Sequence, residues 1–142
     1  TTAAVAEAVA IPVLANGDID SAEQARKVLA HTGAAGVMIG RAAQGAPWLP
    51  GMIARQLAGE TACEPSRDVQ YATLGEHLRS LHAFYGDLMG PRIARKHVGW
   101  FLDRQSPRSD HKRHFNGLDN GGDQLAYLDT IFMELDQQDL AA

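Results

Sequence analysis

Glycine and polar residues follow two short apolar runs in the first third of the chain. Asn16-Gly17-Asp18 ends the first run, and Gly40-Arg41 ends the second. Glycine allows backbone N–H groups to approach a phosphate closely, and a guanidinium group matches the spacing of phosphate oxygens. Either motif alone is more typical of an ordinary loop or a tight packing position. The pair, about 25 residues apart, favours a phosphate site, with Asn16 and Asp18 binding hydroxyl groups of the same ligand.

A second group of candidate residues lies in the segment RIARKH, at residues 92–97. On a helix, Arg92, Arg95 and Lys96 share one face, because positions i, i+3 and i+4 are neighbours. Three cations on one turn repel each other, and RNA phosphates are natural partners for them. The alternative is a charged face that meets only water. For His97, the alternatives are stacking on a base or packing as a satisfied core histidine.

The sequence offers little that is typical of a metal or catalytic site. The six histidines are not spaced as metal ligands, and no HExxH or paired-cysteine pattern accompanies them. Cys63 is the single cysteine, which excludes an intramolecular disulfide. No nucleophile–base pair and no pair of acid–base carboxylates stands out. We therefore expect no metal site and assign no catalytic residue to this chain.

The formal net charge of −4 argues at first sight against a nucleic-acid partner. The charge is distributed unevenly, however. Basic side chains crowd into residues 92–114, whereas the charged side chains of residues 119–139 are acidic. The average charge therefore does not exclude RNA as a partner.

The composition is that of a folded protein that lies outside membranes. Hydrophobic residues make up 45% of the chain and charged residues 21%, which is ordinary for a globular domain. No stretch approaches the roughly 20 apolar residues of a membrane helix, and the first residues do not resemble a signal peptide. We expect a cytoplasmic protein without a membrane partner.

One predicted helix separates the two phosphate-site motifs. Residues 11–15 and 36–39 predict buried parallel strands, and residues 21–33 predict an amphipathic helix between them. This spacing is typical of a (β/α) barrel or a doubly wound sheet. Two strands cannot form a complete barrel or a complete doubly wound sheet. We therefore interpret them as the last two β/α units of a (β/α)8 TIM barrel. The alternative is a very small open sheet.

Helical patterns dominate the remainder of the chain, so the predicted fold class is α/β followed by all-α. We predict helices at about 46–57, from Ser66 to Gly86, from Gly90-Pro91 to about Arg104, around 111–118 and at about 125–135, with a break at Ser106-Pro107. Short connections between such helices indicate a small antiparallel bundle. The predicted domains are a barrel remnant at 1–58, a linker at 59–65 and a helical bundle at 66–142.

Three segments, in this order and spacing, resemble the bacterial tRNA-dihydrouridine synthase family. They are IPVLANGDI (11–19), MIGRAAQGAPW (38–48) and RIARKHVGWFL (92–102). The resemblance is to the C-terminal part of that family and covers nearly the whole chain. GDI or GR alone matches many flavin barrels, whereas GRAAQGxPW and RxARKH make the resemblance specific.

The resemblance implies a flavin-dependent oxidoreductase that uses FMN and NADPH to reduce uridine to 5,6-dihydrouridine in tRNA. It implies an FMN-binding TIM barrel followed by a helical tRNA-binding domain. Its cofactor-binding positions match Asn16, Gly17, Asp18, Gly40 and Arg41, and its tRNA-binding positions match Arg92, Arg95, Lys96 and His97. The family's proton-donating cysteine belongs to an earlier barrel loop, and Cys63 does not match it. We therefore expect the chain to be an inactive fragment of such an enzyme.

Two other functions are compatible with these residues. The helical part can act as a stand-alone RNA-binding module, or the chain can belong to another FMN-dependent TIM-barrel oxidoreductase whose helices only pack. A barrel remnant also leaves the flanks of apolar strands uncovered. We expect residues 1–45 either to self-associate with another copy or to be poorly ordered.

Overall fold

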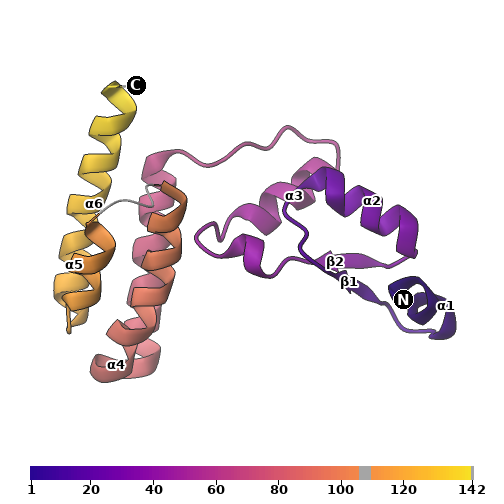
Figure 1. The fold of residues 1–142 in the computed structure, drawn as a ribbon, viewed down its shortest axis with the longest axis horizontal. Coiled ribbons are helices and arrows are strands. Elements are labelled where there is room, and N and C mark those ends of the chain that lie inside the picture. The colour runs from indigo at the N-terminus through magenta and orange to yellow at the C-terminus, as the bar shows by residue number, and fades with distance from the viewer. Residues whose placement is uncertain (106–109, 142) are drawn as a thin grey trace. The chain divides into compact units, whose positions relative to one another are not determined.

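The computed structural model describes residues 1–105 and 110–141 (Figure 1). It divides the chain into two units, Thr1–Glu64 and Pro65–Ala142. The predicted break at Ser106-Pro107 lies outside the described residues.

The stretch before this division, predicted as a linker at 59–65, is bound to the first unit. The carbonyl oxygen of Ala62 accepts a hydrogen bond of 2.6 Å from Gln56 Nε2. Glu64 Oε1 accepts one of 3.2 Å from Trp48 Nε1. The segment is therefore held by side chains that precede it in the sequence, and the division falls at its end.

The first unit is built on two parallel strands, as the sequence predicts. The first strand covers residues 14–16 rather than 11–15, and residues 11–15 are not all buried as predicted, since Ile11 is 72% exposed. Its elements are α1 (Thr2–Ala8), β1 (Leu14–Asn16), α2 (Ala22–Thr32), β2 (Gly36–Met38), the 3-10 helix η1 (Arg41–Ala43) and α3 (Leu49–Leu57). β1 and β2 pair in parallel, with Ala15 opposite Val37. Parallel strands need a crossover connection, and α2 supplies it.

Local signals in the sequence set both ends of α2. Ser21 is its N-cap, and the Ser21 side chain accepts a 3.4 Å hydrogen bond from the backbone of Gln24. At the other end, Gly33 takes a left-handed conformation with φ 64°, and its N–H donates to the carbonyl oxygen of Leu29. Glycine is favoured at this position because a side chain is strained there.

The core of the first unit lies on one side of the strand pair. Ile19, Ala22, Ala25 and Ile53 are buried together, and partly buried residues of β2, α2 and α3 pack against them. The other side is open, since Leu14 is 61% exposed and Met38 45% exposed. The unit therefore buries one face of its strands and leaves an apolar face uncovered.

The second unit consists of α4 (Arg67–Gln105), α5 (His111–Gly117) and α6 (Gly121–Ala141). α4 is two helices joined at Gly86, whose φ of 72° and ψ of −178° are not helical. We call residues 67–85 the first half of α4 and residues 87–105 the second half. The sequence correctly predicts a helix end at Gly86, but the second helix begins before the predicted start at Gly90-Pro91. Gly86 alone reverses the direction of the chain, so the second half begins directly after it and Pro91 lies inside that half.

Gly90 has a packing role instead. A Cβ atom at this position would lie 2.8 Å from the Cα atom of His82 and 3.2 Å from the carbonyl oxygen of Leu81. No side chain fits there, so glycine allows the two halves of α4 to approach each other closely. Further along the pair, Arg67 Nη1 donates a 2.6 Å hydrogen bond to Gln105 Oε1, as expected of antiparallel helices.

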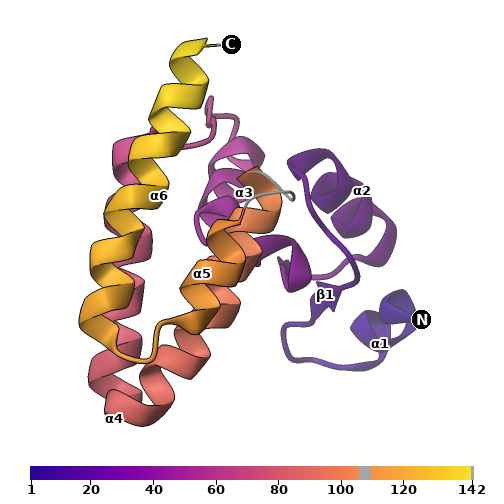
Figure 2. The same ribbon diagram turned by 60° about the vertical axis from the view of Figure 1, so that its left-hand side comes forward.

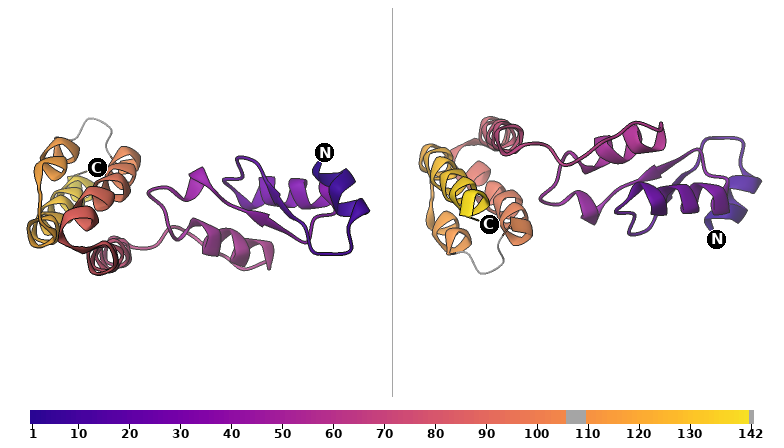
Figure 3. Two further views of the ribbon diagram at one scale, coloured as in Figure 1. Left: turned by 90° about the horizontal axis from the view of Figure 1, so that it is seen from below. Right: turned by 90° about the horizontal axis from the view of Figure 1, so that it is seen from above.

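α6 lies beside both halves of α4 (Figure 2). The Phe132 ring meets Tyr71 of the first half edge-on at 5.3 Å and stacks on Phe101 of the second half at 5.2 Å. At the other end, the buried side chain of Gln124 bonds His82 of the first half and the carbonyl oxygen of Pro91 of the second, both at 3.0 Å. Figure 3 views the resulting bundle nearly along its helices.

Gly86→Ala should destabilise the second unit. The φ and ψ of Gly86 lie in a region that is open essentially only to glycine, so a side chain there should lower the free energy of unfolding by about 1–3 kcal/mol. Urea denaturation followed by circular dichroism measures this change. Gly117→Ala is the matched control, because Gly117 has no atom within 4 Å of an added Cβ and no positive φ. An equal effect of the two substitutions would contradict the role assigned to Gly86.

Candidate functional site

The structure brings the two predicted groups of phosphate-site residues together at one edge of the strand pair. Asn16 is the last residue of β1 and lies opposite Met38, the last residue of β2. Arg41 Nη2 lies 2.5 Å from Asp18 Oδ1, so residues 23 positions apart in the sequence form an ion pair. A carboxylate, a guanidinium group and an amide are thereby available to a single ligand.

The backbone around these side chains is open. Gly17 has a φ of 152° and the following Asp18 a φ of 44°, a left-handed conformation that aspartate tolerates. At Gly40, the nearest atom to an added Cβ is Met38 Sδ, at 3.9 Å. The chain therefore leaves room for a ligand against the backbone at both strand ends.

The helix starts near this edge are only partly as predicted. α2 begins directly after Ser21, close to the end of β1, as expected. α3 begins at Leu49, and the 3-10 helix Arg41–Ala43 occupies the position after β2. The helix predicted at about 46–57 therefore begins at Leu49 and not at the second strand end, because the chain makes a short 3-10 turn first.

The ion pair between Asp18 and Arg41 is exposed to solvent. The Arg41 side chain is 77% exposed and that of Asp18 74% exposed. Exposed ion pairs contribute little to stability, so a ligand anion can replace the carboxylate at modest cost. This edge of the sheet suits a ligand with an anionic group and neighbouring hydroxyl groups.

The basic segment lies in the second half of α4, and its three cations do not act alike. Arg92 and Lys96 are exposed, and neither has an ion-pair partner among the described residues. Arg95 turns toward the connection between α5 and α6, where Nη2 bonds Asp119 Oδ1 at 2.7 Å and the carbonyl oxygen of Leu118 at 3.1 Å. The predicted face of three solvent-facing cations is thus reduced to two, because an acidic residue distant in sequence binds the third.

His97 packs between the halves of α4. Its Nδ1 atom lies 3.1 Å from His77 Nε2, and its ring meets the Trp100 ring edge-on at 5.2 Å. Burial lowers the pKa of His97 below its usual value, and the nearby charges of His77 and Lys96 lower it further. Of the two alternatives for His97, the geometry favours the packed, neutral histidine, which keeps the helix that carries Arg92 and Lys96 in place.

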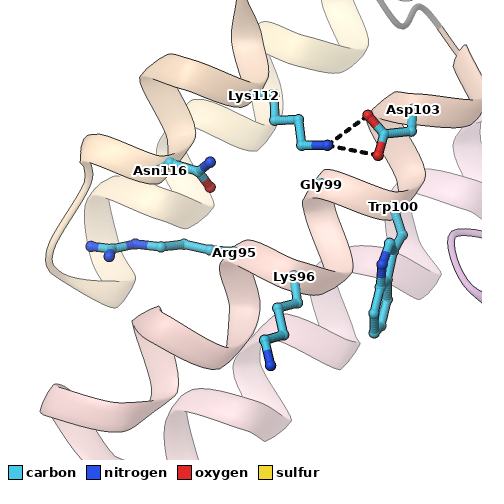
Figure 4. Close-up of a pocket in the computed structure, with 7 residues that line it drawn as sticks. All are labelled: Arg95, Lys96, Gly99, Trp100, Asp103, Lys112 and Asn116. Carbon is cyan, nitrogen blue, oxygen red and sulfur yellow. Dashed lines mark hydrogen bonds and ion pairs between the residues drawn. The ribbon is translucent and has the colours of Figure 1, made fainter.

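A pocket of about 500 Å³ lies between the second half of α4 and α5 (Figure 4). Its lining includes Asp103, Lys112 and Asn116, which no motif in the sequence marks as site residues. Lys112 falls inside the basic window 92–114, and this is the one sequence feature that suggests a functional role for Lys112. The pairing of α5 with α4 is a long-range contact that the local pattern does not reveal.

Within residues 1–105 and 110–141, no three side chains of metal-binding type come together. The part of the chain that the structure describes has no helix long and apolar enough to cross a membrane. Cys63 is exposed and forms no disulfide.

Comparison with known proteins gives a consistent match. The model of the family described as dihydrouridine synthase matches residues 1–136. A protein from Vibrio cholerae named tRNA-dihydrouridine synthase B is 50% identical over 131 residues, which are 91% of this chain and 40% of that protein. A protein of the same name from Pseudomonas putida is 49% identical over 135 residues, covering 94% of this chain and 40% of that protein. The chain thus spans about 40% of the length of these relatives.

Arg95→Ala and Lys96→Ala should separate a packing role from a surface role. Removing Arg95 breaks the bonds to Leu118 and Asp119, so we expect a loss of about 1–3 kcal/mol in the free energy of unfolding. Lys96→Ala removes an exposed side chain and should change it by no more than about 0.5 kcal/mol. Urea denaturation of the two variants measures both values. Equal stabilities would contradict the structural role of Arg95.

Proposed function

The chain belongs to the dihydrouridine synthase family, and we propose that it is part of an enzyme that reduces uridine to 5,6-dihydrouridine in tRNA. The observation that carries this proposal is the family match over residues 1–136, together with relatives about half identical to the chain. Since the chain spans about 40% of those relatives, the reaction belongs to the longer protein. A tRNA substrate is consistent with a cytoplasmic enzyme.

The first unit is proposed as the last two β/α units of an FMN-binding TIM barrel. Successive side chains of a barrel strand alternate between the interior and the surrounding helices. Ala15 is buried on the helix side, and Leu14 and Met38 are exposed on the other side, where the interior of a barrel would be. In the isolated chain, this apolar face favours self-association with another copy.

FMN is proposed to bind at the edge where Asp18 meets Arg41. The residues fit its phosphate and ribityl chain, because the backbone at Gly17 and Gly40 is open and a guanidinium group is close by. Asn16 and Asp18 supply partners for ribityl hydroxyl groups. The chemistry that bound FMN would supply is hydride transfer to the uracil ring, with NADPH as the reductant. The residues of this chain hold and orient one end of that cofactor.

The second unit is proposed as the tRNA-binding domain. Arg92 and Lys96 are exposed cations one helical turn apart, available to backbone phosphates. Arg95 and His97 support them from within the bundle, through Asp119 and His77 respectively. Because this unit has its own core, it also supports the alternative of a stand-alone RNA-binding module. Another FMN-dependent TIM-barrel oxidoreductase would share the first unit but would not bind RNA.

The 142-residue chain should bind tRNA without reducing it. We expect no dihydrouridine when the chain is incubated with FMN, NADPH and unmodified tRNA, because the family's proton-donating cysteine has no match in this sequence. Quantification of dihydrouridine in the recovered tRNA measures the reaction, and gel retardation measures binding. Turnover by this chain would contradict the assignment of the proton donor to another segment. Reduction of a small molecule in the absence of RNA would favour the alternative of another FMN-dependent TIM-barrel oxidoreductase.

Substitution of the exposed cations should weaken tRNA binding in a salt-dependent manner. Each phosphate contact releases counterions, so Arg92→Ala and Lys96→Ala should each reduce the slope of log affinity against log salt by about 1. Fluorescence anisotropy at several salt concentrations measures the slope. Lys27→Ala is the matched control, because Lys27 is an exposed lysine of the first unit that pairs with Glu23. A slope equal to that of the Lys27 variant would contradict the assignment.

A further inference from the structure

The pocket between the second half of α4 and α5 contains a concentration of charge that the proposed contacts of Arg92 and Lys96 do not explain. It is lined by Arg95, Lys96, Gly99, Trp100, Asp103, Lys112 and Asn116 (Figure 4). Three of these side chains are cationic, one is a carboxylate and one is an amide. The charged residues come from two helices and line a shared space of about 500 Å³.

Gly99 determines how Lys112 enters this pocket. A Cβ atom on Gly99 would lie 3.3 Å from Lys112 Cε, a tight contact. Because Gly99 has no side chain, the stem of Lys112 crosses the second half of α4 and its ammonium group reaches Asp103. Figure 4 shows Lys112 pointing toward Asp103, with Asn116 on the same helix as Lys112.

Two of the three cations are already paired with carboxylates. Lys112 Nζ lies 2.7 Å and 2.6 Å from the two carboxylate oxygens of Asp103. Arg95 bonds Asp119, yet its buried Nε atom has no partner among the described residues. Lys96 has no ion-pair partner among them.

The pair of Lys112 and Asp103 is only half-buried, with side chains 46% and 48% exposed. Half-exposed ion pairs are weak, because water solvates both charges. An incoming anion can therefore take Lys112 from Asp103. A phosphodiester group suits this exchange, since it offers two anionic oxygens to cations on different helices and accepts a hydrogen bond from an amide.

We propose that this pocket binds a backbone phosphodiester of RNA through Lys96, Lys112 and Asn116, and that Asp103 is the internal counterion that the phosphate displaces. This inference rests on the proposed tRNA-binding function of the second unit and extends its RNA surface from α4 onto α5. Asp103 then limits affinity, because its charge competes with the phosphate and repels it. The paired Lys112 remains correctly positioned when RNA is absent.

Asp103→Asn should strengthen the binding of unmodified tRNA to the full 142-residue chain by about threefold to tenfold, because the competing charge is removed. Lys112→Met keeps the stem over Gly99 but removes the charge, and should weaken binding by a similar factor. Fluorescence anisotropy measures both affinities, and circular dichroism verifies the fold of each variant. Asp136→Asn is the matched control, because it makes the same change in net charge at an exposed residue of α6 that lines a different pocket.

The outcomes separate this inference from the function on which it rests. If the unchanged chain binds tRNA but Asp103→Asn behaves like Asp136→Asn, the pocket assignment is overturned and the tRNA-binding function stands. If the unchanged chain does not bind tRNA, the pocket assignment and the proposed tRNA-binding function of the second unit are both overturned. Inorganic pyrophosphate is the competitor that tests for a small phosphate compound, and we expect it not to displace tRNA at matched ionic strength. Displacement that depends on Lys112 would overturn the assignment to RNA.

Discussion

The two halves of α4 pack closely because Gly90 has no side chain. A Cβ atom there would overlap the backbone at His82, so any larger residue would force the halves apart. At this short separation, His77 reaches His97 and holds the second half in one rotational position. That position decides which residues of the basic segment face solvent and which face α5 and α6. The surface proposed to bind RNA therefore depends on the absence of one side chain at Gly90, two residues before Arg92.

The first unit depends on a comparable constraint, the parallel pairing of β1 and β2. Strands that run in the same direction end at the same edge, and the crossover helix α2 must lie on one face. Consequently Asp18 and Arg41 meet, although 23 positions separate them. The same arrangement leaves Leu14 and Met38 uncovered on the other face. The parallel pairing of β1 and β2 thus produces both the edge where Asp18 meets Arg41 and the open apolar face. Both features fit the proposal that this unit is a segment of a barrel.

The sequence predicts those features that short-range patterns determine. The two strands, the helix between them and the helix end at Gly86 follow from apolar spacing and from glycine. The meeting of the strand ends follows from the rule that parallel strands end together. The orientation of the Arg95 side chain cannot be predicted from local sequence, because its partner Asp119 lies 24 positions away, in the connection between α5 and α6. The predicted start of the second helix at Gly90-Pro91 is wrong for a related reason, since a glycine that permits close packing, followed by proline, resembles the start of a helix.

Carboxylates partner cations at both proposed binding surfaces. Asp18 holds Arg41 in the first unit, and Asp119 and Asp103 hold Arg95 and Lys112 in the second. These pairs reconcile a net charge of −4 with anionic partners, because Arg41 and Lys112 are each kept in position by a carboxylate that a phosphate can replace. Such a surface attracts RNA less strongly at long range than a purely basic patch does. If this surface binds RNA as proposed, its affinity depends on phosphates that fit the spacing of the cations, which would favour a folded RNA over an arbitrary polyanion.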